Sequence, residues 1–240
     1  MPERPHRDFA NTRWTIVLAA GGARSSASDE ALATLYQTYW RPLYGFLRRR
    51  GHSRDEAEEL TQAFFAFLLE KGTLRHADRD RGRFRSFLLT SLKNFVANEH
   101  DRQTAQKRGG RVPLLSLEIE TEEGRFQIEP PTEETPETVF ERRWAQALLE
   151  RVFVRLREGM TPAKALQFEH LKVHLTGERT QGGYAQTAAV LQMSEGAIRT
   201  EVSRLRDRFG DLLWQEIAHT VSSAEQIEDE IRHLLSAVGR

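Results

Sequence analysis

Apolar residues along the chain recur at the three- and four-residue spacing of amphipathic helices, and no stretch alternates apolar and polar residues as a half-buried strand does. The clearest helical stretches are residues 32–47, 57–68, 84–95, 140–152 and 198–209. One face of residues 84–95 gathers Phe84, Phe87, Leu88, Leu92 and Phe95. The pattern predicts an all-α protein.

Capping residues mark several helix ends within this pattern. Ser53 and Glu56 fit a capping box, in which a side-chain oxygen accepts from the third helical N–H and the glutamate reaches back. Gly51 just before them suits a helix end, because glycine tolerates positive φ. A second capping box, Ser223 with Gln226, opens an amphipathic stretch near the end of the chain.

Charge divides the chain more sharply than hydropathy does. The 35 basic and 35 acidic residues cancel, yet residues 75–111 hold ten basic and four acidic residues, whereas residues 118–141 hold nine acidic residues and one basic residue. The acidic stretch also carries three prolines and favours a solvated connector. We therefore expect two helical domains joined by a flexible acidic linker. The expected segments are an N-terminal extension (1–28), a helical domain (29–110), the linker (111–134), a second helical domain (135–210) and a C-terminal extension (211–240).

Other classes of protein find little support in the sequence. No apolar run reaches the roughly 18 residues of a membrane span, and no secretory cleavage pattern is present, so we expect a cytoplasmic protein. The chain has no Cys, which excludes disulfides and thiolate metal sites. His170 and His174 have metal-compatible spacing but lack a third ligand. With no set of catalytic residues in a recognisable context, we expect neither an enzyme nor a bound cofactor or metal.

Residues 184–209, "YAQTAAVLQMSEGAIRTEVSRLRDRF", have the pattern of a helix-turn-helix. Ala188 allows close approach of the two helices, and Ser194 caps the second. A wheel of about 100° per residue places a buried stripe at Ile198, Val202, Leu205 and Phe209. An ordinary helical hairpin with a solvated arginine-rich face is the alternative interpretation.

Taken as a whole, the chain resembles a bacterial RNA polymerase sigma factor of the extracytoplasmic-function type. "LYQTYWRPLYGFLRRRG" and "DEAEELTQAFFAFLLEKG" resemble the first helices of that family, and the second of these resembles its docking surface for the β′ clamp helices of core RNA polymerase. "GRFRSFLLTSLKNFVANEHDR" resembles the segment that reads and melts the promoter −10 element. "YAQTAAVLQMSEGAIRTEVSRLRDR" resembles the segment that reads the −35 element.

The resemblance implies roles for particular residues. Core polymerase contacts fall on Glu59, Leu60 and Gln62, although Ala63 stands where relatives commonly carry an acid. The implied DNA contacts are Arg83, Arg85, Lys93 and Asn94 in the first domain and Arg199, Thr200, Ser203 and Arg204 in the second. Glu201 stands where many relatives carry a base, and its carboxylate would either reject a phosphate or accept from a cytosine amino group.

Three functions remain open at this point. The first is a sigma factor that binds core polymerase and promoter DNA, with an anti-sigma factor as a further partner. The second is a helix-turn-helix regulator that binds DNA as a dimer without core polymerase, and the third is a helical scaffold with an incidental basic face. The extension at 211–240 either covers its own DNA-reading domain or regulates the protein by contacting a partner or masking a binding face.

Overall fold

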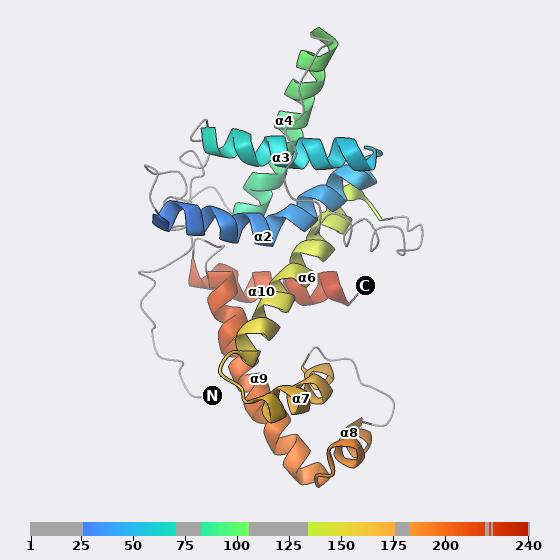
Figure 1. The fold of residues 1–240 in the computed structure, drawn as a ribbon, viewed down its shortest axis with the longest axis vertical. Coiled ribbons are helices and arrows are strands. Elements are labelled where there is room, and N and C mark those ends of the chain that lie inside the picture. The colour runs from blue at the N-terminus through green and yellow to red at the C-terminus, as the bar shows by residue number, and fades with distance from the viewer. Residues whose placement is uncertain are drawn as a thin grey trace. The chain divides into compact units, whose positions relative to one another are not determined.

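The computed structural model describes residues 26–70, 83–105, 134–175, 183–218, 221 and 223–239. Its helices, labelled in Figure 1, are α2 (Ser26–Arg49), α3 (Arg54–Glu70), α4 (Phe84–Ala105), α6 (Pro136–Arg157), α7 (Pro162–Leu171), the 3-10 helix η4 (Lys172–His174), α8 (Gly183–Leu191), α9 (Glu195–Ala218) and α10 (Ala224–Val238). No strand occurs among the described residues, so the predicted all-α class is confirmed for them.

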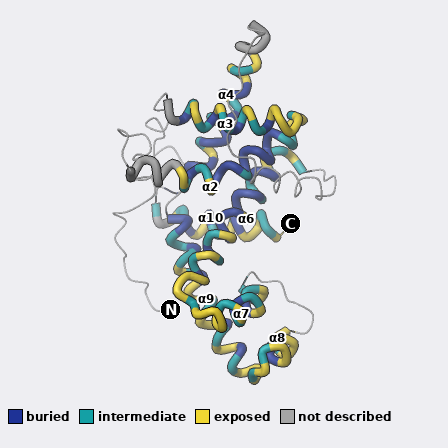
Figure 2. Tube along the Cα trace, in the orientation of Figure 1, coloured by how far each residue is buried: buried dark blue, intermediate teal, exposed yellow. Residues whose placement is uncertain are grey.

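The described residues fall into two compact units, one formed within residues 1–147 and 218–240 and the other within 148–217. Aromatic side chains join the helices of the first unit. Tyr39 on α2 meets Phe84 on α4 edge to face, with ring centroids 5.5 Å apart, and Phe64 on α3 contacts Phe95 on α4 at 5.6 Å. Such pairs contribute roughly 0.5–1.5 kcal/mol each beyond the burial of their area. Of the apolar face predicted for residues 84–95, Phe84, Leu88, Leu92 and Phe95 are buried and Phe87 is partly buried. Arg85, Leu89 and Val96 on α4 are buried as well. Figure 2 colours the chain by this burial.

Local sequence explains the junction between α2 and α3. Gly51 follows the end of α2 with φ of 95°, a conformation that glycine adopts without strain. Ser53 N donates to Glu56 Oε2 at 2.8 Å, and Glu56 N donates to Ser53 Oγ at 3.3 Å, which confirms this capping box. The Ser223 side chain, by contrast, makes no capping hydrogen bond at the start of α10. The prediction that its hydroxyl accepts from a backbone N–H of this helix is therefore wrong.

The compact units divide at a different place from the predicted domains. We expected the second domain to begin at residue 135 and the extension to begin at residue 211, but the units divide after Ala147, and residues 218–240 belong to the first unit. Burial explains the difference, because Trp144 on α6 and Ile227 and Leu234 on α10 are fully buried. Residues 211–218 continue α9. Most of the predicted linker, residues 111–133, lies outside the described residues.

The second unit is built on the last part of α6, on α7, η4 and α8, and on α9. A buried cluster of Leu171, Ala188, Ile198 and Val202 joins α7, α8 and α9. Phe153 on α6 lies 5.7 Å from the ring of Phe209 on α9. None of the described helices is long and apolar enough to span a bilayer.

Candidate nucleic-acid interface

Arg85, in the first turn of α4, is the centre of a buried ionic network. Its side chain is held by Glu230 on α10, to which Arg85 Nε donates at 2.6 Å and Nη2 at 3.1 Å. Arg85 Nη1 also donates to Glu141 on α6, and the guanidinium lies 4.9 Å from the ring centre of Trp144. Only 3% of Arg85 is exposed. This side chain is therefore satisfied by two carboxylates and an aromatic face, all within the first unit.

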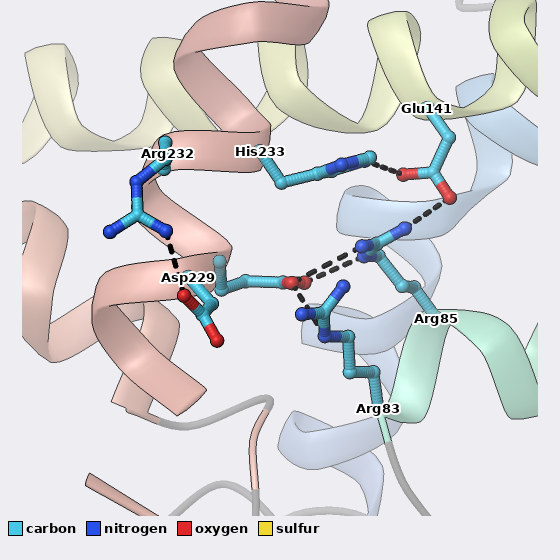
Figure 3. A network of polar contacts seen from close by, with 7 residues as sticks. Arg83, Arg85, Glu141, Asp229, Arg232 and His233 are labelled. Atoms are coloured by element: carbon cyan, nitrogen blue, oxygen red, sulfur yellow. Dashed lines mark hydrogen bonds and ion pairs between the residues drawn. The ribbon is translucent and has the colours of Figure 1, made fainter. Parts of the chain in front are cut away.

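Arg83 and His233 extend the network at its two ends. Arg83 Nε lies 2.9 Å from Glu230 Oε2, so the one carboxylate of Glu230 receives two arginines. His233 Nε2 lies 3.0 Å from Glu141 Oε2. Figure 3 shows Arg83 and Arg85 directed toward α10, with Glu141 between Arg85 and His233. Glu230 is fully buried, and its two arginine partners supply the compensation that a buried charge requires.

Burial alone would lower the pKa of Arg85, because it disfavours the charged form. The hydrogen bonds and charge of Glu230, and then those of Glu141, act in the opposite direction and hold the pKa above its ordinary value. Arg85 thus remains a cation inside the protein. A cation in this position requires anionic partners at all times.

Lys93, two turns along α4, also has an acidic partner. Its Nζ lies 2.7 Å from Glu137 Oε1 at the start of α6 and 5.7 Å from the ring centre of Phe46. Both ends of the ion pair are more than a third exposed. The hydrogen bond from Lys93 lowers the pKa of Glu137. Beside Lys93, Asn94 is exposed.

The four predicted DNA contacts, Arg83 just before α4 and Arg85, Lys93 and Asn94 on it, therefore differ in accessibility. Asn94 is exposed, and Arg83 and Lys93 are partly exposed. Arg85 is buried, so the expectation that it faces outward is wrong for this arrangement of the chain, because α10 and α6 cover it. Sequence reasoning missed Glu230 as the partner. The available signal was an acid within the apolar stripe of residues 227–235, since a charge on a buried helix face requires a buried counter-charge.

The predicted contacts for core polymerase lie on α3. Glu59 is exposed, and Leu60 and Gln62 are half-buried. Gln62 Nε2 donates to Glu58 Oε1 at 3.3 Å, one turn earlier on the same helix. Ala63, at the position where an acid was expected, is exposed. The helix thus presents a mixed apolar and polar strip, partly open to solvent.

The second unit places α8 and α9 around a tight turn. Met193 N donates to Ala188 O at 3.0 Å across this turn, and Gln192 takes a φ of 54° within it. Ser194 caps α9 as predicted, since Ala197 N donates to its Oγ at 3.2 Å. Leu191, Met193 and Leu205 pack against the buried cluster that joins the helices.

All four predicted contacts on α9, Arg199, Thr200, Ser203 and Arg204, are exposed. Arg204 Nη1 lies 3.0 Å from Glu201 Oε1, and Arg199 Nη2 lies 3.5 Å from Glu195 Oε2. The acidic partner of each arginine is thus on its own helix, at the surface, where ion pairs contribute roughly 0–1 kcal/mol. Arg199 also lies 5.9 Å from the ring centre of Tyr184 on α8. These arginines exchange partners at little cost.

His174 joins η4 to α8 and α9 within the second unit. Its Nε2 lies 2.9 Å from Thr187 Oγ1, and Arg206 donates to its backbone oxygen from Nη2 at 2.9 Å. Burial, and then the charge of Arg206, lower the pKa of His174. His170, the histidine four residues before it, is exposed. Among the described residues no group of three or more His, Cys, Asp or Glu side chains is arranged to hold a metal ion.

Comparison with known proteins finds a family match within the first unit. Residues 35–106 match the family model for Sigma-70 region 2. No curated protein matches the chain, and no solved structure does. The matched residues include all of α3 and α4 and most of α2, the helices that carry the predicted polymerase contacts and the basic residues Arg85 and Lys93. The match over these residues supports a sigma-70 family factor. Members of that family are non-enzymatic initiation factors that bind RNA polymerase and take part in promoter melting.

Proposed function

We propose that the chain is a sigma factor of the extracytoplasmic-function type, which recruits core RNA polymerase to promoters and opens DNA there. The match of residues 35–106 to Sigma-70 region 2 is the observation that carries this proposal. In this function α3 docks on the β′ clamp helices, α4 contacts the −10 element, and the N-terminal half of α9 reads the −35 element. The chain itself performs no covalent chemistry.

The exposed strip on α3 supports the polymerase contact. Leu60 is half-buried within the first unit, and Glu59 beside it is exposed. Protein interfaces commonly combine an apolar centre with a polar rim. Docking would bury the remaining exposed part of Leu60 and leave the carboxylate of Glu59 and the amide of Gln62 at the edge.

The exposed residues of α9 support the contact with duplex DNA. Arg199 and Arg204 carry donors for phosphates and guanine edges, and Thr200 and Ser203 carry hydroxyls that suit either. They lie near the start of a helix that follows a tight turn, the arrangement in which a recognition helix enters the major groove. Glu201 fits a cytosine amino group, while its pairing with Arg204 reduces its repulsion of phosphates.

The overall charge of zero fits binding in two steps. A neutral chain gains little from long-range attraction to DNA. Once polymerase holds the first unit at the promoter, contacts from the second unit become intramolecular, and the effective concentration of each surface rises. The isolated protein is therefore expected to bind promoter DNA weakly, and the holoenzyme is expected to bind it tightly.

The direct test combines a pull-down with core RNA polymerase and run-off transcription from a library of duplexes with randomised −35 and −10 elements. The proposal predicts a stable complex with core polymerase and transcripts that share two spaced motifs. A regulator of the helix-turn-helix class would instead select palindromic sites without core polymerase. Tight sequence-specific binding by the isolated chain, unaffected by core polymerase, would overturn the proposal.

A further inference from the structure

Each cationic side chain on the predicted DNA face of α4 already has a carboxylate partner from later in the chain. Glu230 on α10 holds Arg83 and Arg85, Glu141 on α6 also holds Arg85, and Glu137 holds Lys93. A carboxylate presents two oxygens to a guanidinium in the same forked geometry that a phosphate offers. The acids therefore occupy the positions that a nucleic-acid backbone would take.

We propose that α10 is an autoinhibitory helix, whose Glu230 occupies the Arg83–Arg85 pair and must leave before α4 can bind the DNA backbone. The inference rests on the proposed function only in taking DNA as the ligand that competes with α10. It concerns the first unit alone and assigns a function to α10. This helix lies outside residues 35–106, which the family model matches.

The composition of α10 suits a mimic of a nucleic-acid backbone. Its first half carries four acidic residues, Glu225, Glu228, Asp229 and Glu230. Arg232 is the one Lys or Arg in the helix, and His233 follows it. Three of the acids are exposed, whereas Glu230 is fully buried and directed to the arginines. Ile227 and Leu234, one turn on either side of Glu230, are also fully buried and supply the apolar part of the docking.

Packing alone does not account for Glu230. Replacing a buried ion pair by well-packed apolar residues is often neutral or stabilising, so a helix that served only to cover the core gains nothing from a buried carboxylate. A contact that must exchange with another anion does benefit from a buried carboxylate, because Arg85 then stays charged and can bind a phosphate when Glu230 leaves. The buried charges make the closed arrangement sensitive to a polyanion.

The first experiment weakens the packing of α10 against the first unit and leaves Arg83 and Arg85 unchanged. Ile227→Asp introduces a charge on the buried face, and Leu235→Asp introduces the same charge on the same helix at a side that is 46% exposed. Binding is measured by fluorescence anisotropy with a labelled single-stranded DNA of about 16 nucleotides. Ile227→Asp is expected to bind about 5- to 150-fold more tightly than the unaltered chain, the usual range of coupling between two sites. Leu235→Asp is expected to leave the affinity unchanged.

Salt dependence shows whether the gain comes from the arginines. Each phosphate neutralised on a single strand contributes about 0.7 to the slope of log affinity against log salt, so release of Arg83 and Arg85 is expected to steepen the slope by about 1.4. Adding Arg83→Ala and Arg85→Ala to Ile227→Asp should remove both the gain and the change of slope. An opened variant with unchanged affinity and slope would overturn the inference.

A second measurement uses the unaltered chain and so does not depend on whether a variant folds. Coupling is reciprocal, so a ligand that competes with α10 must promote its release. Saturating single-stranded DNA is expected to speed amide hydrogen exchange across residues 224–238, while the amides of α2 and α3 stay protected. DNA binding with α10 amides equally or better protected would refute the autoinhibitory role.

The outcomes separate the two proposals. If core polymerase binds and supports transcription, but opening α10 changes neither DNA affinity nor the salt slope, the autoinhibitory role is wrong and the sigma-factor function stands. If opening α10 exposes a salt-dependent DNA surface, but no complex with core polymerase forms, the sigma-factor function is wrong and the masking of a nucleic-acid site by α10 stands.

Discussion

Gly45 on α2 and Arg143 on α6 lie so close together that a Cβ atom added to Gly45 would stand 2.5 Å from Cδ of Arg143. Arg143 is buried, at 4% exposure, so its side chain has little room to move away. Gly45→Ala gains about 1 kcal/mol of helix propensity, but overpacking typically costs about 1–3 kcal/mol. We expect a net loss of stability of about 1 kcal/mol, measured by urea unfolding.

Gly210 on α9 gives the matched control, because no described atom lies within 4 Å of a Cβ built there. Gly210→Ala is expected to stabilise the protein by about 0.5–1 kcal/mol through helix propensity alone. Equal effects of the two substitutions would show that the close approach of Arg143 carries no energetic weight.

Arg85→Met tests the cost of leaving Glu230 without its main partner. Removing one member of a buried pair typically costs about 3–5 kcal/mol, and Arg83, which is only partly buried, compensates for part of this. We expect a loss of about 3 kcal/mol in urea unfolding. Adding Glu230→Gln should recover most of the loss, because the uncompensated charge is then gone. Additive losses in the double variant would contradict this account of the network.

Leu60→Ala on α3 is expected to weaken binding to core RNA polymerase by about 1–3 kcal/mol, the range of a contact near the centre of an interface. Leu60 is half-buried, so circular dichroism must first show that the helices persist. Leu166→Ala provides the control, because this leucine on α7 is 70% exposed and lies outside the predicted surface. Pull-down with core polymerase gives the measurement, and equal binding by both variants would remove α3 from the proposed interface.

Arg204→Glu is expected to reduce holoenzyme binding to duplexes that carry a −35 element by about 1–3 kcal/mol. Its control is Arg232→Glu on α10, since each arginine is exposed and pairs with an acid three residues earlier, Arg204 at 3.0 Å and Arg232 at 2.8 Å. The two reversals should therefore change stability alike, while only Arg204→Glu changes DNA binding. Duplex binding that survives Arg204→Glu unaltered would exclude this part of α9 from the DNA interface.

The lowered pKa of His174 predicts that acid weakens the second unit. The folded state favours the neutral imidazole, so below its ordinary pKa of about 6.5 the unfolded chain binds more protons. Stability is then complete above about pH 6.5 and is lost as the pH falls through the lowered pKa of the folded protein. Urea unfolding at a series of pH values should show this decline. His174→Gln should flatten it, whereas the change of the exposed His170 to Gln should not.

Helix positions and the buried stripe of α9 followed from periodicity, because a helix wheel depends only on local geometry. Of the stripe that the wheel predicted, Ile198, Val202 and Phe209 are buried and Leu205 is partly buried. The Ser53–Glu56 capping box was equally predictable, since its two residues are three positions apart. Local rules sufficed for these contacts, whereas the equally local Ser223 cap at the start of α10 does not form.

The partners of α4 were beyond such rules. Arg85 and Glu230 are separated by 145 positions, and nothing in local spacing indicates that they meet. The predicted linker ends at residue 134, and Glu137 and Glu141 belong to the domain predicted to follow it, yet both bind cations at α4 in the first predicted domain. The predicted boundary at residue 135 differs from that of the compact units for the same reason, because tertiary burial of Trp144 decides it.

The place of Glu230 near the end of the chain has a consequence for how the protein is made. Its unit otherwise consists of residues up to Ala147, so the ribosome must add some eighty residues after the first helices before this carboxylate exists. At roughly 5–20 residues per second this takes on the order of ten seconds. Every newly synthesised molecule therefore passes through a stage in which Arg85 has Glu141 but not yet Glu230 as a counter-ion, and a chain cut short by premature termination never leaves that stage.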